Sequence, residues 1–167
     1  AVSPLPSISD RGLVVDLLDL RLAVQPALAG IKHLNRLEQV LGAREAAARG
    51  LDEGLMADGD GFVTCGTRAN LFAHLDGRWI TPPVDRAGVA GIARGVLLEQ
   101  WRPDGGLHVA PLRIDDLSRV EALIVCNAVR AILPVARIGA RELRARPDDF
   151  TQARAALAAS HPAFHES

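Results

Sequence analysis

The sequence predicts an α/β domain built on a mixed, strongly curved sheet, a pseudo-barrel, with helices packed outside it. A chain of 167 residues is long enough to bury one good core. Its middle third consists of short β-prone runs separated by glycine-containing turns, and alanine- or leucine-rich runs with helical spacing lie on either side. Many short strands with tight turns favour a sheet that twists and curls on itself.

The first elements are a strand and a helix. Apolar residues with alternating Asp and Leu predict a strand over residues 12–22, following an irregular lead-in over residues 1–10. Asn35 has the character of an N-cap, with Glu38 three residues later in a variant of the capping box. The alanine-rich run that follows is predicted to continue the helix to Gly50.

Four short strands are predicted next, over residues 52–58, 62–65, 69–75 and 78–81. Gly59-Asp60-Gly61 and Asp76-Gly77 are turn signals between them, and Pro82-Pro83 ends the pairing. Turns spaced this closely predict an antiparallel meander.

The second half begins with a glycine-rich loop at residues 88–91, which leads into an amphipathic helix ending near Trp101. A helix N-terminus after glycines offers free N–H groups and a positive dipole end, which suits a phosphate. Further elements are predicted as strands over residues 107–112, 120–126 and 132–139, a helical turn over 114–117, and a packing helix over 148–160.

The composition narrows the function classes. The formal net charge is −1 and the arginines are scattered singly, so neither nucleic acid nor a membrane surface is an expected partner. No signal peptide or membrane-spanning run is evident, so the expected location is the cytoplasm. Cys65 and Cys126 are too few and too far apart for a metal cluster or a disulfide framework, and both are predicted to be small buried residues. A small-molecule substrate remains the expected partner, and no metal site is predicted.

Lys32 is the only lysine among nineteen basic residues. A bias toward arginine replaces lysine wherever a surface charge suffices, so the surviving lysine points to a need for a primary amine, which can lose its proton and attack a carbonyl. Ile31, Leu34 and Leu37 are predicted to surround it with apolar side chains, which disfavours the charged amine. The alternative is a lysine whose stem lies on apolar surface with its head in water, and both interpretations stay open.

Residues 30–41, GIKHLNRLEQVL, resemble the lysine segment of the 4-amino-4-deoxychorismate lyases. These belong to the fold-type IV pyridoxal-phosphate enzymes, together with the branched-chain and D-amino acid aminotransferases. The resemblance extends to the second hairpin (residues 63–72), the glycine-rich loop (88–94) and residues 126–128. It implies that Lys32 is catalytic and holds pyridoxal 5'-phosphate as a Schiff base. The cofactor-binding residues that it implies are Lys32, Cys65, Gly91, Ile92, Ala93, Asn127 and Ala128.

Two departures from the family stand out. Cys65 occupies the position of the family's glutamate, which pairs with the pyridine nitrogen, so the cofactor becomes a weaker electron sink. The family also carries an N-terminal domain that supplies a phosphate-binding arginine. Here residues 1–21 are interpreted as lead-in and first strand, and residues 22–167 as the cofactor-carrying C-terminal domain. The resemblance further implies a homodimer.

The resemblance implies a lyase that converts 4-amino-4-deoxychorismate to 4-aminobenzoate and pyruvate in folate biosynthesis. One alternative is a class IV aminotransferase, and another is a degenerate or isolated domain without catalysis, in keeping with Cys65. Arg68 either faces a substrate carboxylate or is simply solvated. His33 is interpreted as structural, and His74, Trp79 and Trp101 as packing residues.

Overall fold

The computed structural model describes residues 12–160, and its strands form one mixed sheet in the order β3-β2-β1-β8-β7-β4-β5-β6, with β9 paired to β8. The strands are β1 (Leu13–Leu22), β2 (Glu53–Asp58), β3 (Val63–Gly66), β4 (Asn70–Leu75), β5 (Arg78–Thr81), β6 (Leu107–Val109), β7 (Ala122–Asn127), β8 (Ala131–Ile138) and β9 (Arg141–Glu142). The helices are α1 (Leu37–Ala48), α2 (Ile92–Gln100), the short 3-10 helix η1 (Ile114–Ser118) and α3 (Pro147–Ser160).

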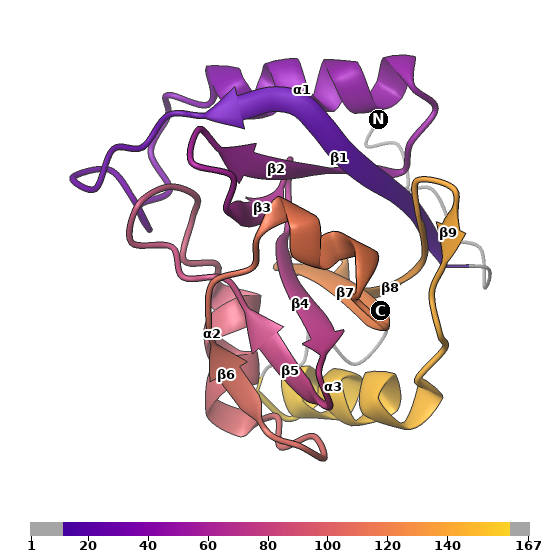
Figure 1. Cartoon of the computed structure of the whole chain (residues 1–167). Helices are drawn as coiled ribbons and strands as arrows, with labels where there is room; N and C mark the ends of the chain where they lie inside the picture. Colours follow the sequence, from indigo (N-terminus) through magenta and orange to yellow (C-terminus); the bar gives the residue numbers. More distant parts are fainter. Residues whose placement is uncertain (1–11, 161–167) are drawn as a thin grey trace, which may run out of the picture.

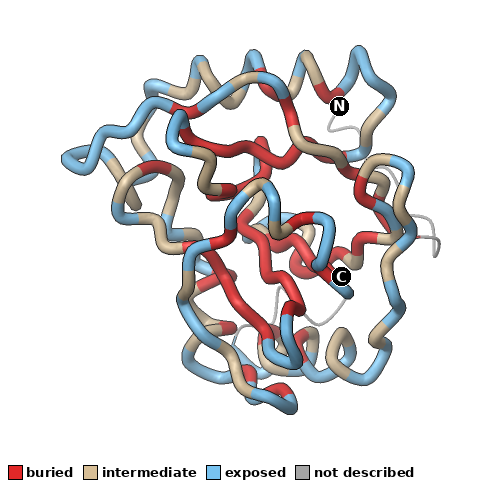
Figure 2. Tube along the Cα trace, in the orientation of Figure 1, coloured by how far each residue is buried: buried red, intermediate tan, exposed pale blue. Residues whose placement is uncertain are grey.

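The sheet is buried on both faces, and its strands divide their side chains between an inner and an outer core. In β4, Leu71 and Ala73 point into the inner core, whereas Phe72 between them packs on the outer side. The same division between inner and outer core is found in five other strands: β1, β2, β5, β7 and β8. The sheet therefore curls around an apolar interior, as Figure 2 shows by the buried strands at its centre.

Two separate helix layers cover the outer face (Figure 1). Helix α1 lies along β1 and β2 and shares a small core with β1, β2 and β3. Helices α2 and α3 pack on each other at the opposite end and share a larger core with β4, β5, β7 and β8, which contains Phe72, Trp79 and Trp101.

The segment between β6 and β7 brings the two open edges of the sheet together. The Val63 N–H of edge strand β3 donates to the Leu112 carbonyl at 2.8 Å, and the Ile114 N–H donates to the Gly61 carbonyl at 3.0 Å. This closure confirms the predicted α/β class with a curled, barrel-like sheet and outer helices.

Most predicted elements are confirmed within a residue or two, but the antiparallel meander is wrong. Strands β2 and β3 form one hairpin and β4 and β5 another, while β4 pairs with β7 and not with β3. All six residues of β4 are buried, and such a strand is stable inside a sheet with a paired strand on each side, here β5 and β7. Strand β1, which was predicted over residues 12–22, lies between β2 and β8. The predicted lead-in over 1–10 lies outside the described residues.

Candidate active site

Lys32 lies on the loop that connects β1 to α1, and this loop is hydrogen-bonded to the glycine-rich loop before α2. The Gly30 N–H donates to the Gly88 carbonyl at 3.1 Å, and the Ala90 N–H donates to the Gly30 carbonyl at 2.9 Å. Gly30 has a φ of +78°, a conformation that L side chains rarely adopt, so a glycine is required at this junction. The sole lysine therefore stands two residues from a fixed contact with the predicted phosphate loop.

The predicted apolar surroundings of Lys32 are not formed by the described residues. Lys32 is exposed, and its neighbours Ile31, Leu34 and Leu37 are 53%, 101% and 64% exposed. Three apolar residues close in sequence bury a lysine only if another element covers them, and among residues 12–160 none does. The prediction of a desolvated amine is therefore wrong for this part of the molecule.

The predicted capping box is also wrong. Helix α1 begins at Leu37 with Arg36 as N-cap, and no side chain caps it. The Glu38 carboxylate instead accepts a hydrogen bond from the Ala23 N–H at 2.7 Å, at the other end of the same loop. Glu38 thus closes the base of the Lys32 loop, and Asn35 remains exposed.

The N-terminus of α2 is open to a ligand. Gly91 is the N-cap and no side chain caps the helix, so the first N–H groups, those of Ile92 and Ala93, are available to an anion. The Asn70 amide donates to the Val89 carbonyl at 2.8 Å, which fixes the preceding loop. A Cβ atom at Gly91 would lie 2.2 Å from the Asn70 Oδ1, so this approach also requires glycine.

The turn after β7 is held by Asn127. Its Oδ1 accepts hydrogen bonds from the N–H groups of Val129 and Arg130 at 2.9 and 2.8 Å, and its Nδ2 donates to the Arg68 carbonyl at 3.2 Å. Ala128, the predicted second phosphate contact, is exposed at the tip of this turn.

Asn70 connects these loops. It begins β4, it lies opposite Cys126 in the pairing with β7, and its side chain holds the loop before α2. Together with the Gly30 contacts, this arrangement brings three predicted segments to one end of the sheet. They are the Lys32 loop, residues 91–93 and the turn at Asn127 and Ala128. The importance of Asn70 was missed in the sequence, where it appeared only as one residue of a strand.

Cys65 lies in β3, close to these loops, and is buried. A Cβ atom on Gly88 would lie 3.8 Å from its sulfur, which places the thiol next to the glycine-rich loop. Burial is the main cause that raises the pKa of the Cys65 thiol to about 12; the neighbouring Glu53 carboxylate acts in the same direction and the charge of Arg36 opposes it. The thiol is therefore neutral near pH 7 and supplies no negative charge.

Glu53 on the adjacent strand does not replace the missing carboxylate. Its Oε1 accepts hydrogen bonds from the Thr67 N–H at 2.9 Å, the Thr67 hydroxyl at 2.5 Å and the Gly54 N–H at 2.9 Å. These bonds hold the turn between β3 and β4, so the role of Glu53 is structural.

Arg94, in the first turn of α2, is buried without a carboxylate within 4.0 Å among residues 12–160. Its Nε donates to the Thr81 hydroxyl at 3.0 Å and its Nη2 to the Pro82 carbonyl at 2.9 Å. Burial lowers the pKa of Arg94, and burial also raises the pKa of the nearby Cys126 thiol to about 12. Arg94 fixes the start of α2 to the end of β5, and Cys126 is the small buried residue that was predicted.

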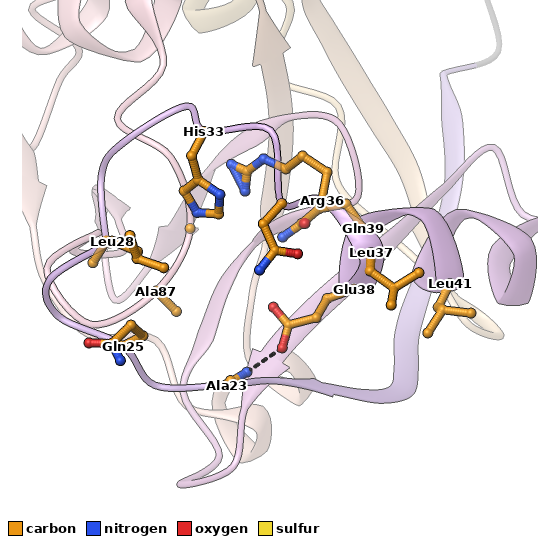
Figure 3. A pocket seen from close by; sticks show the side chains of 13 residues that line it. Ala23, Gln25, Leu28, His33, Arg36, Leu37, Glu38, Gln39, Leu41 and Ala87 are labelled. Carbon is orange, nitrogen blue, oxygen red and sulfur yellow. Dashed lines mark hydrogen bonds between the residues drawn. The ribbon is translucent and has the colours of Figure 1, made fainter.

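A pocket of about 390 Å³ opens beneath the Lys32 loop. It is lined by residues of the 23–29 segment, by His33 and Arg36, by the first turn of α1, and by Ala87 and Gly88 (Figure 3). Lys32, Ile92, Ala93, Asn127 and Ala128 are not part of its wall.

Arg36 and His33 stand out in this wall. The Nε and Nη2 of Arg36 and the Nδ1 of His33 are buried and make no hydrogen bond to any described residue. A buried, charged donor without an acceptor is costly unless a ligand or water satisfies it. No pattern in the sequence distinguishes Arg36, although it lies four residues after Lys32 and its charge acts to lower the pKa of the Cys65 thiol.

Comparison with known proteins identifies the family. The model of the amino-transferase class IV family matches residues 2–138. The chain belongs to this family. It is 34% identical over 134 residues to an aminodeoxychorismate lyase from Vibrio harveyi, covering 80% of this chain and 49% of that protein. It is 35% identical over 136 residues to a putative branched-chain-amino-acid aminotransferase from Methanocaldococcus jannaschii, covering 81% of this chain and 44% of the relative.

A solved structure gives the same family. The 4-amino-4-deoxychorismate lyase from Pseudomonas aeruginosa superposes with a TM-score of 0.81 at 34% identity, covering 95% of this chain and 60% of that one. The chain thus spans about half the length of the curated relatives it matches. No helix within residues 12–160 has the length and apolar character needed to cross a membrane.

The residues present fit pyridoxal phosphate in three respects and fail in one. The cofactor is a phosphorylated aldehyde with a phenolic oxygen. The single lysine amine suits the aldehyde, the uncapped helix N-terminus suits the phosphate, and the unsatisfied donors of Arg36 suit an oxygen of the cofactor. A neutral, buried thiol at Cys65 does not suit a protonated pyridine nitrogen, because it offers no charge to hold that proton.

Proposed function

We propose that this chain is the cofactor-carrying part of a pyridoxal-phosphate-dependent lyase. It converts 4-amino-4-deoxychorismate to 4-aminobenzoate and pyruvate. The observation that carries the proposal is the pair of hydrogen bonds joining Gly30 to Gly88 and Ala90, because they connect the loop of the only lysine to the loop that leads into an uncapped helix N-terminus. The lyases among the relatives support the same activity.

The residues of this chain take separate roles toward the cofactor. Lys32 would hold it covalently through Nζ, while the N–H groups of Ile92 and Ala93 and the turn at Asn127 and Ala128 would bind its phosphate. Arg36 would donate to an oxygen of the bound group, which would satisfy its buried guanidinium. When bound, the cofactor supplies an electron sink for the carbon that bears the amino group.

Lys32 also moves the proton of the reaction. Its free amine removes the proton from the ring carbon that carries the amino group, the carbon–oxygen bond to the enolpyruvyl group breaks, and the ring becomes aromatic. The proton then passes to the methylene carbon of the departing enolpyruvate, which leaves as pyruvate. Atoms balance without another reactant.

Cys65 favours this reaction over transamination. Formation of an aromatic ring supplies much of the driving force for elimination, so a weakened electron sink costs the lyase less than it costs an aminotransferase. The relative from Methanocaldococcus jannaschii makes an aminotransferase the second candidate. A second substrate, an amino acid that releases a keto acid, distinguishes the two.

The first experiment measures the absorbance of the protein with added pyridoxal phosphate, before and after borohydride reduction. We expect a visible band that reduction fixes onto the Lys32 peptide in mass spectrometry, and no fixed cofactor in Lys32→Ala. Incubation with substrate should then release 4-aminobenzoate and pyruvate in equal amounts. A reduced cofactor retained by Lys32→Ala, or keto acid release from amino acids without 4-aminobenzoate formation, would contradict the proposal.

We also infer the domain organisation, the assembly and the location of the protein. Residues 22–167 form the cofactor-carrying domain, the protein is a homodimer, and it acts in the cytoplasm on a step of folate synthesis. Membership of the family supports each of them. Light scattering of the purified protein tests the dimer, since a monomer mass at micromolar concentration would contradict it.

A further inference from the structure

Two arginines stand on neighbouring turns at the end of the sheet that carries the candidate site. Arg68 is in the turn between β3 and β4, and Arg130 is in the turn between β7 and β8. The Asn127 amide donates to the Arg68 carbonyl at 3.2 Å, and its Oδ1 accepts from the Arg130 N–H at 2.8 Å. One side chain therefore connects the backbones of both arginines and fixes the two turns relative to each other.

Within the described residues, Arg68 makes one long ion pair and Arg130 makes none. The Arg68 side chain is 63% exposed, and its nearest carboxylate oxygen, Oε2 of Glu53, is 3.9 Å away. The other oxygen of Glu53 is occupied by Thr67 and Gly54. Arg130 is half-buried and has no acidic partner within 4.0 Å in residues 12–160. The two guanidinium groups therefore face a single carboxylate, that of Glu53, within the ion-pair distance.

Two apolar side chains are exposed at the same end of the sheet. Val129, next to Arg130, is 68% exposed, and Ile92, at the start of α2, is 74% exposed. Asn70 joins the loops that bear them, through its pairing with Cys126 and its bond to the Val89 carbonyl. This end of the sheet thus offers apolar surface together with two guanidinium groups, the groups that bind carboxylates in a bidentate manner.

We propose that Arg68 and Arg130 bind the carboxylates of a ring-bearing dicarboxylate substrate and set the preference of the enzyme for two carboxylates over one. The inference rests on the proposed function, whose substrate is a six-membered ring with one carboxylate on the ring and another on the enolpyruvyl ether. Val129 and Ile92 contact the ring. Both arginines are specificity residues, and the proton transfer remains with Lys32.

Calorimetry with stable ring compounds tests binding apart from catalysis. The dicarboxylate probe is 3-(carboxymethoxy)benzoate and the matched monocarboxylate is 3-methoxybenzoate, both added to the cofactor-loaded protein. We expect the dicarboxylate to bind about tenfold more tightly, a preference that Arg68→Ala and Arg130→Ala each reduce and the double variant abolishes. Arg78→Ala is the control, because Arg78 is an exposed arginine at the far end of the β4–β5 hairpin. If the ratio of the two dissociation constants, dicarboxylate to monocarboxylate, is the same in the double variant and in Arg78→Ala, the inference is overturned.

Kinetics give the second readout. With 4-amino-4-deoxychorismate, each alanine variant should raise KM about tenfold and leave kcat within about twofold, while Arg68→Lys and Arg130→Lys recover part of the loss. The absorbance of bound cofactor should not change in any variant. A fall in kcat or in cofactor binding with an unchanged KM would overturn the inference.

The two proposals fail in different ways. If the wild-type protein forms no 4-aminobenzoate but still prefers the dicarboxylate probe through Arg68 and Arg130, the proposed reaction is wrong and the dicarboxylate site stands. If it forms 4-aminobenzoate and the double variant retains the preference, the reaction stands and the arginine inference is wrong.

Discussion

The two helix layers of this molecule differ in how much of their apolar surface they bury. The layer of α2 and α3 buries Ala93, Leu97 and Leu157 against the sheet, together with Trp79 and Trp101. The layer of α1 buries little beyond Gly42 and Ala46, and most of its outer surface is exposed in Figure 2.

The apolar residues around Lys32 continue the exposed surface of α1. Leu37, Val40 and Leu41 of the helix are 64%, 54% and 40% exposed, and Leu34 is fully exposed. Stability is therefore concentrated in the layer of α2 and α3, whereas Lys32, the residue assigned to the proton transfer, lies where the described chain packs least. The comparison predicts that equal substitutions at the two ends have very unequal effects on folding.

The largest effect is expected at Trp101. Its ring is fully buried, with ring centroids 5.7 Å from Phe72 and 5.1 Å from Trp79. Trp101→Ala should lower the free energy of unfolding by about 3–5 kcal/mol, measured by urea denaturation. Trp101→Phe is the control, because it keeps an aromatic ring and removes an indole N–H that has no partner within residues 12–160. A loss below about 1 kcal/mol for the alanine variant would contradict the comparison.

Gly91, where the loop of the candidate site meets α2, should give a smaller effect. Gly91→Ala places a Cβ atom 2.2 Å from Oδ1 of Asn70, whose amide is already bonded to the Val89 carbonyl. We expect a loss of about 1–3 kcal/mol in unfolding free energy from this overpacking. Gly95→Ala in the same helix is the matched control, because open space surrounds that position, and alanine there should be neutral or stabilising by up to about 1 kcal/mol. Equal effects of the two substitutions would contradict the prediction.

Glu45 connects α1 to the sheet through hydrogen bonds. Its substitution should change the unfolding free energy less than Gly91→Ala does. Its carboxylate accepts hydrogen bonds from the N–H groups of Asp19 and Leu20 at 2.7 and 3.1 Å. Burial acts to raise the pKa of Glu45, but these bonds and the nearby Arg49 outweigh it, so the pKa lies below its usual value. Glu45→Gln should lower the unfolding free energy by about 1 kcal/mol near pH 7, after allowance for partial exposure.

The pH dependence of Glu45 has a fixed sign. Because its pKa is lower in the folded protein, its contribution is complete above the unfolded-state value of about 4.3 and is lost as the pH falls through the folded-state value. The stability difference between wild type and Glu45→Gln should therefore shrink on acidification in denaturant titrations. A difference that grows at low pH would contradict the assignment.

The sequence predictions were accurate where a local signal decides the structure. Strands and turns were predictable where one local signal fixes them, as at Gly59-Asp60-Gly61 and Pro82-Pro83. The packing roles of Trp79, Trp101 and His74 followed from their place in apolar runs, and all three are buried.

The errors arose where a distant residue decides the outcome. Glu38 satisfies the Ala23 N–H across the loop and not its own helix end, and β4 pairs with β7 rather than with its neighbour in sequence. Arg36 gave no signal, because an arginine without a partner is visible only once its surroundings are known. Local pattern thus predicted the elements, and the family resemblance predicted the loops of the candidate site, but neither predicted the hydrogen bonds that join the Lys32 loop to the loop before α2.

The smallest effect is expected at Leu34, and it gives the sharpest test of the comparison. Leu34→Ala and Leu97→Ala remove the same atoms, one from a residue that is 101% exposed and the other from a residue that is 0% exposed. Leu97→Ala should cost about 2–5 kcal/mol of unfolding free energy, whereas Leu34→Ala should stay within about 0.5 kcal/mol. A comparable loss at both positions would mean that the apolar residues beside Lys32 are packed in solution. In that case the amine would be shielded as its neighbours in the sequence first indicated, and the unequal burial of the two helix layers would not hold.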